Sequence, residues 1–322
     1  MACFPSKYEG KHADPGWRGT RLGTMSDVAI LDHVPETVQT ARGPVQVVRT
    51  GSGPPILAVH GTPGGWDQAT AMGRFLADAG FEVIAPSRPG YLGTPLDDGK
   101  TIDEQADLHA ALLDALGIER VGLFLWSGGG PSGYRLAVRH PEKVSAIVAL
   151  AAVGDAYHVD HESLSDRFLM KTGPGNWLMR FLSAHAPEQL VSGTLGTEGD
   201  LTKEQLEEQV AEAMGDPKKL ELVRVVAAGV SDRAHRGAGE DNDLEQFAAI
   251  ESLELERIAA PTLLVQGSAD IDVLPRYSEF TASSIPGAEL VVLGGGTHLA
   301  LFVHPEAEAA QQRAIEHYRA HA

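Results

Sequence analysis

Short hydrophobic runs alternate with longer segments of helical spacing over most of the chain. Continuous apolar runs typical of strands buried on both faces cover Ile56–His60, Phe81–Ser87, Val121–Trp126, Val144–Val153 and Thr262–Ser268. Between the runs, Trp66–Gly80 and Asp103–Leu116 have apolar residues at helical intervals, and Gly117 is placed to cap the second helix. This alternation predicts an α/β fold with a mainly parallel, doubly wound sheet and helices on both faces.

Both ends of this pattern add further elements to the sheet. Val38–Gly53 alternates polar and apolar positions around a glycine turn, which predicts an antiparallel hairpin at a sheet edge. After Thr262–Ser268, the pattern predicts a helix, a strand over Ala288–Leu293 and a terminal helix from Pro305. The sheet therefore draws strands from both halves of the chain.

The alternation stops between residues 155 and 258, a segment too long for a plain loop. Residues 176–184 have helical spacing, and Thr202 and Gln205 stand at capping-box spacing at the start of another helix. We predict that residues 155–258 form an inserted helical cap over the carboxyl edge of the sheet, where ligands bind in open α/β sheets. The core would then consist of residues 25–154 and 259–322.

Residues 1–24 lack the apolar centre of a signal peptide, and their composition predicts a disordered leader. Met25 begins a more conventional segment and is an alternative start. No run reaches the roughly 18 apolar residues of a membrane helix. A single cysteine, Cys3, excludes an internal disulfide and suits a reducing compartment. These features predict a soluble, cytoplasmic protein.

Charge narrows the set of partners. The chain of 322 residues carries 44 acidic and 26 basic residues, a formal net charge of −18. Such a field repels nucleic acid and anionic lipid surfaces, so we expect neither as a partner. The pattern does not indicate an oligomeric state.

Candidate chemistry begins at the end of the run Val121–Trp126, where Ser127 is followed at once by Gly128, Gly129 and Gly130. Glycines permit a sharp turn, and Pro131 fits the first turn of a following helix. A strand–turn–helix of this kind exposes a serine hydroxyl beside backbone N–H groups, as a nucleophile requires.

The same glycines allow a second interpretation. Gly128–Gly133 also fits the loose dinucleotide pattern G-x-G-x-x-G, and Asp155 lies near the position, about 20 residues further on, where such a fold carries its ribose-binding acid. A lone glycine fingerprint is weak evidence, so the rest of the chain has to decide between a nucleophile turn and a phosphate cradle.

A serine nucleophile needs a base, and the base needs an acid to orient it. Asp270 lies in the loop after Thr262–Ser268, and His298 follows the glycine turn after Ala288–Leu293. Both therefore stand at the carboxyl ends of predicted strands, as Ser127 does. The competing candidates are Asp272 and Asp155 for the acid and His304 for the base.

Five stretches in this order resemble the α/β-hydrolase superfamily, from about Glu36 to the C-terminus: HGTPGG at 60–65, SRPGYLGT at 87–94, WSGGGPSG at 126–133, GSADIDVLP at 267–275 and GTHLALFVHPE at 296–306. The chain order of nucleophile, acid and histidine is also the order of that superfamily. The resemblance implies Ser127 as nucleophile, Asp270 as acid and His298 as base. It implies an oxyanion hole from the backbone N–H groups of Thr62 and Gly128.

One position departs from the superfamily pattern. A small residue is usual two positions before the nucleophile, where this chain has Leu125, while Gly129 keeps the small residue on the other side. The leucine must point away from the His298 loop or displace it.

Other residues have structural as well as functional interpretations. His60 is expected to brace the oxyanion loop, and His158 and His161 are expected to be solvated, so we predict neither a metal nor a cofactor. Trp126, Trp177 and Phe181 are candidates to line an apolar substrate pocket, although the last two can equally form the core of the cap.

The sequence favours a serine hydrolase that cleaves a carboxylic ester or related small acyl substrate through an acyl-enzyme. Ser127 in place of an aspartate makes haloalkane dehalogenases and the usual epoxide hydrolases poor matches. Alternatives on the same fold are a proline iminopeptidase-like aminopeptidase, a C–C hydrolase, a lactonase or a perhydrolase. No carboxylate of the cap can be selected from the sequence to bind a substrate amine. Alternatives of other classes are a non-catalytic binding relative and an NAD(P)-dependent oxidoreductase.

Overall fold

The computed structural model describes residues 33–97, 99–158, 181–182 and 185–321. Eight strands form one sheet in the order β1-β2-β4-β3-β5-β6-β7-β8. They are β1 (Glu36–Thr40), β2 (Gly43–Gly51), β3 (Pro55–Val59), β4 (Glu82–Pro86), β5 (Val121–Trp126), β6 (Val144–Leu150), β7 (Thr262–Gly267) and β8 (Glu289–Leu293). Only β2 runs antiparallel to its neighbours β1 and β4; the pairs from β4 to β8 are parallel. The predicted mainly parallel sheet with an edge hairpin is confirmed.

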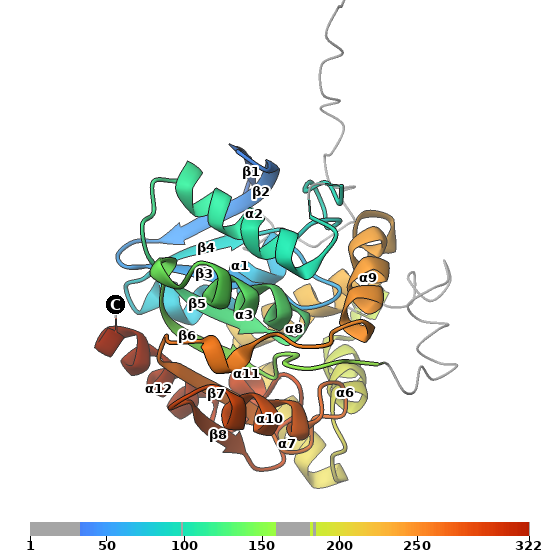
Figure 1. Cartoon of the computed structure of the whole chain (residues 1–322). Helices are drawn as coiled ribbons and strands as arrows, with labels where there is room; N and C mark the ends of the chain where they lie inside the picture. Colours follow the sequence, from blue (N-terminus) through green and yellow to red (C-terminus); the bar gives the residue numbers. More distant parts are fainter. Residues whose placement is uncertain (1–32, 98, 159–180, 183–184, 322) are drawn as a thin grey trace, which may run out of the picture.

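Helices cover both faces of the sheet (Figure 1). Those between or after the core strands are α1 (Trp66–Asp78), α2 (Ile102–Ala115), α3 (Gly130–Arg139), α10 (Pro275–Ser284), α11 (Ala300–Val303) and α12 (Ala307–His321). Successive side chains of a strand point to opposite faces. Phe124 of β5 contacts Phe75 of α1, whereas Leu125 packs against α3, so α1 and α3 lie on opposite faces.

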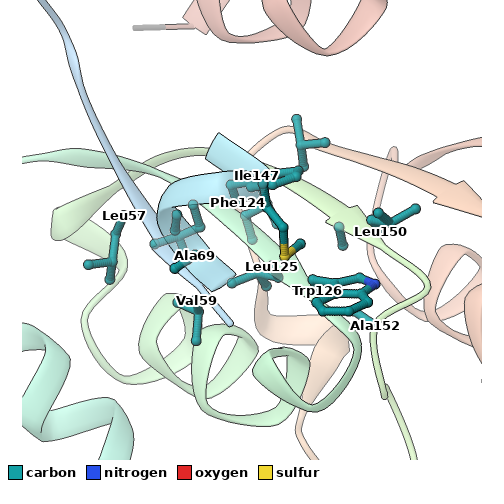
Figure 2. Packing of buried hydrophobic residues seen from close by; sticks show 14 of the residues in the cluster. Leu57, Val59, Ala69, Phe124, Leu125, Trp126, Ile147, Leu150 and Ala152 are labelled. Carbon is teal, nitrogen blue, oxygen red and sulfur yellow. The ribbon is translucent and has the colours of Figure 1, made fainter. Parts of the chain in front are cut away.

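Continuous burial explains the unbroken apolar runs of the central strands. Every residue of β5, β6 and β7 is buried. Figure 2 shows this packing around Phe124, Leu125 and Trp126, with Val59 of β3 and Ile147 of β6 close by. Because β5, β7 and β8 run parallel, their carboxyl ends meet at one edge of the sheet, and the loops that follow them lie together there.

Among the described residues between β6 and β7, four helices follow one another: α6 (Pro187–Glu198), α7 (Lys203–Gly215), α8 (Pro217–Ser231) and α9 (Arg233–Ala248). We call residues 155–258, which include them, the insert. The predicted capping box is confirmed: Thr202 accepts from the Gln205 N–H and the Gln205 side chain accepts from the Thr202 N–H. The division into core and cap domains stays a prediction. In the described ranges, no helix has the length and apolar character needed to span a bilayer.

A glycine on α3 explains how the fold accommodates Leu125. A Cβ atom added to Gly133 would lie 2.2 Å from Cδ2 of Leu125, so the leucine fills the space that this glycine leaves open. Leu125 is fully buried there. The bulky residue near the nucleophile turn is thus directed toward α3.

We expect Gly133→Ala to destabilise the fold by about 2 kcal/mol, because the added methyl overpacks a filled core position. Chemical denaturation measures the loss. Gly193→Ala on α6 is the matched control, since a Cβ there meets nothing within 4 Å and alanine favours a helix. Leu125→Ala should offset much of the cost in the double variant. Equal stability of Gly133→Ala and the wild type would show that Leu125 is not confined by α3.

Candidate active site

Ser127 stands where β5 turns into α3. Its φ of +49° lies in the left-handed region, which non-glycine residues seldom adopt. Gly129 allows the turn to approach β3 closely, because a Cβ at this position would lie 2.4 Å from the carbonyl oxygen of Val59. The strand therefore ends in a sharp, strained turn that holds Ser127 at the carboxyl edge of the sheet, as a nucleophile turn requires.

Asp270 and His298 meet at the same edge from two other strands. Asp270 follows β7, His298 follows β8, and His298 Nδ1 lies 2.8 Å from Asp270 Oδ2. Both side chains are at least 98 % buried. The sequence places these residues 28 positions apart, and the parallel pairing of β7 with β8 brings them together.

Further hydrogen bonds fix the orientation of Asp270. Its Oδ1 accepts from the backbone N–H groups of Asp272 and Val273, and its Oδ2 accepts from the side-chain amide of Gln266. A carboxylate held by four donors keeps one oxygen aimed at Nδ1 and favours the imidazole tautomer with its lone pair on Nε2. The geometry selects Asp270 as the partner of Nδ1.

The competing candidates for the acid and the base do not take part in the contact between His298 Nδ1 and Asp270. Asp272 Oδ2 lies 3.4 Å from His298 Nε2, the opposite side of the ring from Nδ1. His304 Nε2 is within 3.0 Å of the carbonyl oxygen of Gly294, and its Nδ1 accepts from the Glu306 N–H. Asp155 lines a cavity of about 320 Å³ with His158, Arg276, Tyr277 and Phe280, among others, and Ser127, Asp270 and His298 are not among its lining residues.

The side chain of Trp126 packs against the ring of His298. Its ring centroid is 5.2 Å from that of His298, its Nε1–H donates to the His298 carbonyl at 3.4 Å, and only 4 % of the residue is exposed. Within the described residues, no hydrogen bond joins Ser127 to His298, and the buried His298 Nε2 has no hydrogen-bond partner. The contacts of Trp126 are those of a residue that supports the His298 ring.

The pKa of His298 depends on opposing effects. Burial lowers this pKa, but the carboxylates of Asp270, Asp272 and Glu198 outweigh burial and raise it to about 10. This shift moves the range in which the imidazole can act as a base to higher pH than for an ordinary histidine.

We accordingly expect the rate of Ser127 modification by a fluorophosphonate to rise with pH, with its midpoint well above 7. Asp272→Asn removes one carboxylate that raises the pKa, so the midpoint should fall by about one pH unit. The measurement is the labelling rate between about pH 6 and 10. A midpoint near the ordinary imidazole value of 6.5, unchanged in Asp272→Asn, would contradict this electrostatic description.

The loop after β3 is pressed against the nucleophile turn. A Cβ added to Gly128 would lie 2.2 Å from Thr62 Oγ1, and one added to Gly61 would lie 3.1 Å from Ser127 Cβ. The structure therefore brings the two predicted oxyanion donors, Thr62 and Gly128, side by side next to Ser127. His60 lies beneath this loop, where its Nε2 accepts from the Arg88 N–H. Burial and then Arg88 lower the pKa of His60 well below its ordinary value, which keeps the ring neutral.

Two buried ion pairs tie this loop to helix α9 of the insert. Asp243 accepts from Arg88, from Tyr91 and, at 2.5 Å, from Thr62 Oγ1, while both Arg88 and Asp243 side chains are almost fully buried. Two turns earlier on the same helix, Arg236 pairs with Asp67 and donates to the Gly64 carbonyl. Helix α9 therefore holds the loop that carries the Thr62 donor.

Breaking the buried Arg88–Asp243 ion pair should strongly lower the stability of the protein. We expect Asp243→Ala to lower the free energy of unfolding by about 3–5 kcal/mol, because it leaves the buried Arg88 charge unpaired. Asp241→Ala is the control on the same helix, since its pair with Arg233 is largely exposed and should contribute less than about 1 kcal/mol. Urea denaturation compares the two variants. Similar losses would mean that the Asp243 network does not hold the loop.

Glu198, at the C-terminal end of α6, also belongs to the site. Its carbonyl oxygen accepts from the His298 N–H at 3.1 Å, and its Oε2 is buried with no hydrogen-bond partner. Burial chiefly raises the pKa of Glu198 to about 8, Asp272 and Asp270 add to the rise, and His298 opposes it. The sequence analysis found no such carboxylate, because nothing in the local pattern distinguishes Glu198 from the other acids of the insert.

The remaining predicted substrate contacts are less closely placed. Phe181 is 45 % exposed, and its ring centroid lies 4.9 Å from that of His185. Trp177 and His161 lie outside the described residues. The role of Trp126, Trp177 and Phe181 in substrate binding stays a prediction.

Comparison with known proteins agrees with this topology. The sequence model of the alpha/beta hydrolase fold matches residues 54–305, most of the chain. The chain belongs to the alpha/beta hydrolase fold family. An alpha/beta hydrolase fold protein from Nakamurella multipartita has a solved structure that is 52 % identical, with a TM-score of 0.87 over 89 % of this chain and 99 % of that one.

Two further relatives of this alpha/beta hydrolase are named as hydrolases. "Uncharacterized hydrolase YcgS" of Bacillus subtilis (strain 168) is 28 % identical over 268 residues, which are 82 % of this chain and 91 % of that protein. A 2-hydroxymuconate semialdehyde hydrolase of Pseudomonas putida is 36 % identical over 113 residues, 34 % of this chain and 40 % of that one. Gly128–Gly133 lies within the span that matches the hydrolase family, so the family match does not favour the dinucleotide interpretation of this segment.

Proposed function

We propose that the protein is a serine hydrolase that cleaves a carboxylic ester or a related acyl substrate through Ser127, His298 and Asp270. The observation that carries this proposal is the buried contact of 2.8 Å between His298 Nδ1 and Asp270 Oδ2, at the sheet edge where the strained turn holds Ser127. An oriented imidazole beside a serine is the arrangement that activates a weak hydroxyl nucleophile.

The chemistry follows from these positions. Ser127 Oγ attacks the substrate carbonyl while His298 Nε2 takes the hydroxyl proton, and Asp270 stabilises the imidazolium through Nδ1–H. The N–H groups of Thr62 and Gly128 stabilise the oxyanion, with each donor contributing about 3 kcal/mol to the transition state. The protonated His298 then donates its proton to the leaving group, which departs and leaves the acyl-enzyme. A water activated by neutral His298 hydrolyses the acyl-enzyme.

The hydrogen bond between Ser127 and His298 has to form with substrate present. His298 Nε2 now faces Asp272, and catalytic hydrogen bonds of unliganded enzymes are often long until substrate binds.

A substrate panel tests the proposal. We expect hydrolysis of p-nitrophenyl esters, with a preference among acyl chain lengths that shows the size of the acyl pocket, and weaker turnover of lactones and proline arylamides. Ser127→Ala sets the background rate for each substrate. A folded protein whose rates match this background on every substrate would contradict the proposed hydrolase function.

A second candidate function is an aminopeptidase-like activity, and Glu198 favours it. A buried acid that the insert supplies next to the triad is suited to pair with the free amine of a substrate. The discriminating comparison uses amino-acid p-nitrophenyl esters with the amine free or acetylated. The amine-binding role predicts a preference for the free amine that Glu198→Gln abolishes. Equal rates on both substrates would contradict the amine-binding role of Glu198 and leave ester hydrolysis as the proposed activity.

A further inference from the structure

Two acids lie close to the triad histidine, and the proposed ester hydrolysis uses neither of them. One ligand atom each from Glu198, Asp272 and His298 lie within 4.8 Å of one another. They come from α6 of the insert, from the loop after β7 and from the loop after β8. Acidic residues alone do not make a metal site, so the decisive feature is the buried Nε2 atom of His298, which has no hydrogen-bond partner.

His298 presents a buried, unpartnered nitrogen to the two acids. Its side chain is 2 % exposed, its Nε2 has no hydrogen-bond partner, and Nε2 lies 3.4 Å from Asp272 Oδ2. Asp270 binds Nδ1 on the other side of the ring, so Nε2 faces the acids and binds a metal ion with release of its proton. A carboxylate behind a histidine ligand is the usual outer contact of protein zinc sites.

Glu198 is fixed in place by its own backbone. Its carbonyl accepts from the His298 N–H at 3.1 Å, and the next residue, Gly199, forms an isolated bridge with Asp270. The following N–H, that of Asp200, donates to Ala269 at 2.8 Å. The backbone therefore holds the Glu198 side chain against the loops of Asp270 and His298, and its buried Oε2 lacks a donor.

We propose that Glu198, Asp272 and His298 bind a zinc ion, with Nε2 of His298 as the nitrogen ligand. Zinc takes nitrogen and carboxylate ligands at about 2.0–2.2 Å with tetrahedral angles, which puts two of its ligand atoms about 3.3 Å apart. The observed 3.4 Å between His298 Nε2 and Asp272 Oδ2 matches this separation. Three protein ligands leave a fourth position for water. Mg²⁺ prefers an all-oxygen octahedron and is a poor match for this set.

The bound ion would inhibit hydrolysis, and this part of the inference rests on the proposed function. Zinc on Nε2 occupies the lone pair that has to accept the Ser127 proton, so the ion and the reaction exclude each other. Zinc thus holds the enzyme in an inactive state that a chelator reverses.

Calorimetric titration with zinc chloride tests the site on the full chain after EDTA treatment. His317 and His321 lie one helical turn apart on α12, with ring centroids at 4.9 Å, so all variants carry His321→Ala to weaken this second pair. We expect one strong site per chain that Glu198→Gln and Asp272→Asn each weaken at least about tenfold. Glu188→Gln, an exposed acid at the start of the same helix α6, should bind zinc as the parent does. Unchanged affinity in both Glu198→Gln and Asp272→Asn, with folding verified by melting curves, would overturn the site.

A second measurement follows fluorophosphonate labelling of Ser127 in the same proteins. Zinc should slow labelling at least about tenfold, EDTA should restore it, and Mg²⁺ at the same concentration should have no effect. Labelling at full speed with zinc bound, or equal inhibition by Mg²⁺, would overturn the inhibitory role. If the metal-free protein is not labelled at all, the proposed hydrolase function fails, while the titration still decides the zinc site.

Discussion

Ser127→Ala is expected to lower kcat on any hydrolysed ester by roughly 10⁶-fold, since catalytic residues that act as a unit lose nearly all of their effect when one is removed. The variant should fold normally, because Ser127 Oγ makes no hydrogen bond to another described residue and the φ of +49° is set by the surrounding turn. Initial rates on the best ester of the panel, with melting curves for both proteins, provide the measurement.

Ser132→Ala is the matched control for this experiment. Ser132 lies in the same glycine-rich segment and is buried on α3, where its Oγ is 3.4 Å from His109 Nε2. We expect its rate to stay within about threefold of the wild type. A Ser127→Ala protein that keeps a tenth of the activity would show that another group is the nucleophile.

Asp270→Asn is expected to lower kcat by roughly 10⁴-fold with little change in KM. The carboxylate accepts a hydrogen bond from Nδ1–H. An amide group in the same place can instead donate to Nδ1 and favour the other tautomer, which leaves Nε2 protonated and unable to act as base. The loss of a charge partner also removes stabilisation of the imidazolium that forms during attack.

Asp155→Asn controls for a general effect of removing an acid at a strand end. Asp155 follows β6, the strand between β5 and β7, and faces the cavity lined by Arg276 and Tyr277. We expect a rate within about threefold of the wild type. Comparable losses in both variants, or a loss confined to KM in Asp270→Asn, would contradict the assignment of Asp270 as the orienting acid.

Much of the fold is predictable because its elements are locally encoded. The run Val121–Trp126 is apolar at every position because the strand is buried on both faces, and the structure gives β5 the same bounds. The capping residues Thr202 and Gln205 likewise act within one turn. Parallel strands carry their carboxyl ends to one edge, so placing Ser127, Asp270 and His298 after three strands was enough to predict that they gather there.

The other site residues depend on how the insert docks, which no local pattern encodes. Asp243 reaches Thr62 across 181 positions of sequence, and Arg236 reaches Asp67 across 169. Glu198 is one acid among many in the insert until its carbonyl meets the His298 N–H. Leu125 looked too large for the nucleophile turn because the space that receives it belongs to Gly133, a residue of the next helix.

Reaction of the full chain with a fluorophosphonate, followed by mass spectrometry of the intact protein and its peptides, tests the triad most directly. We expect one adduct per chain, on Ser127, absent in Ser127→Ala and formed at least about a hundredfold more slowly in His298→Ala. A folded wild-type protein that stays unmodified, or one that carries the adduct on another residue, would contradict it.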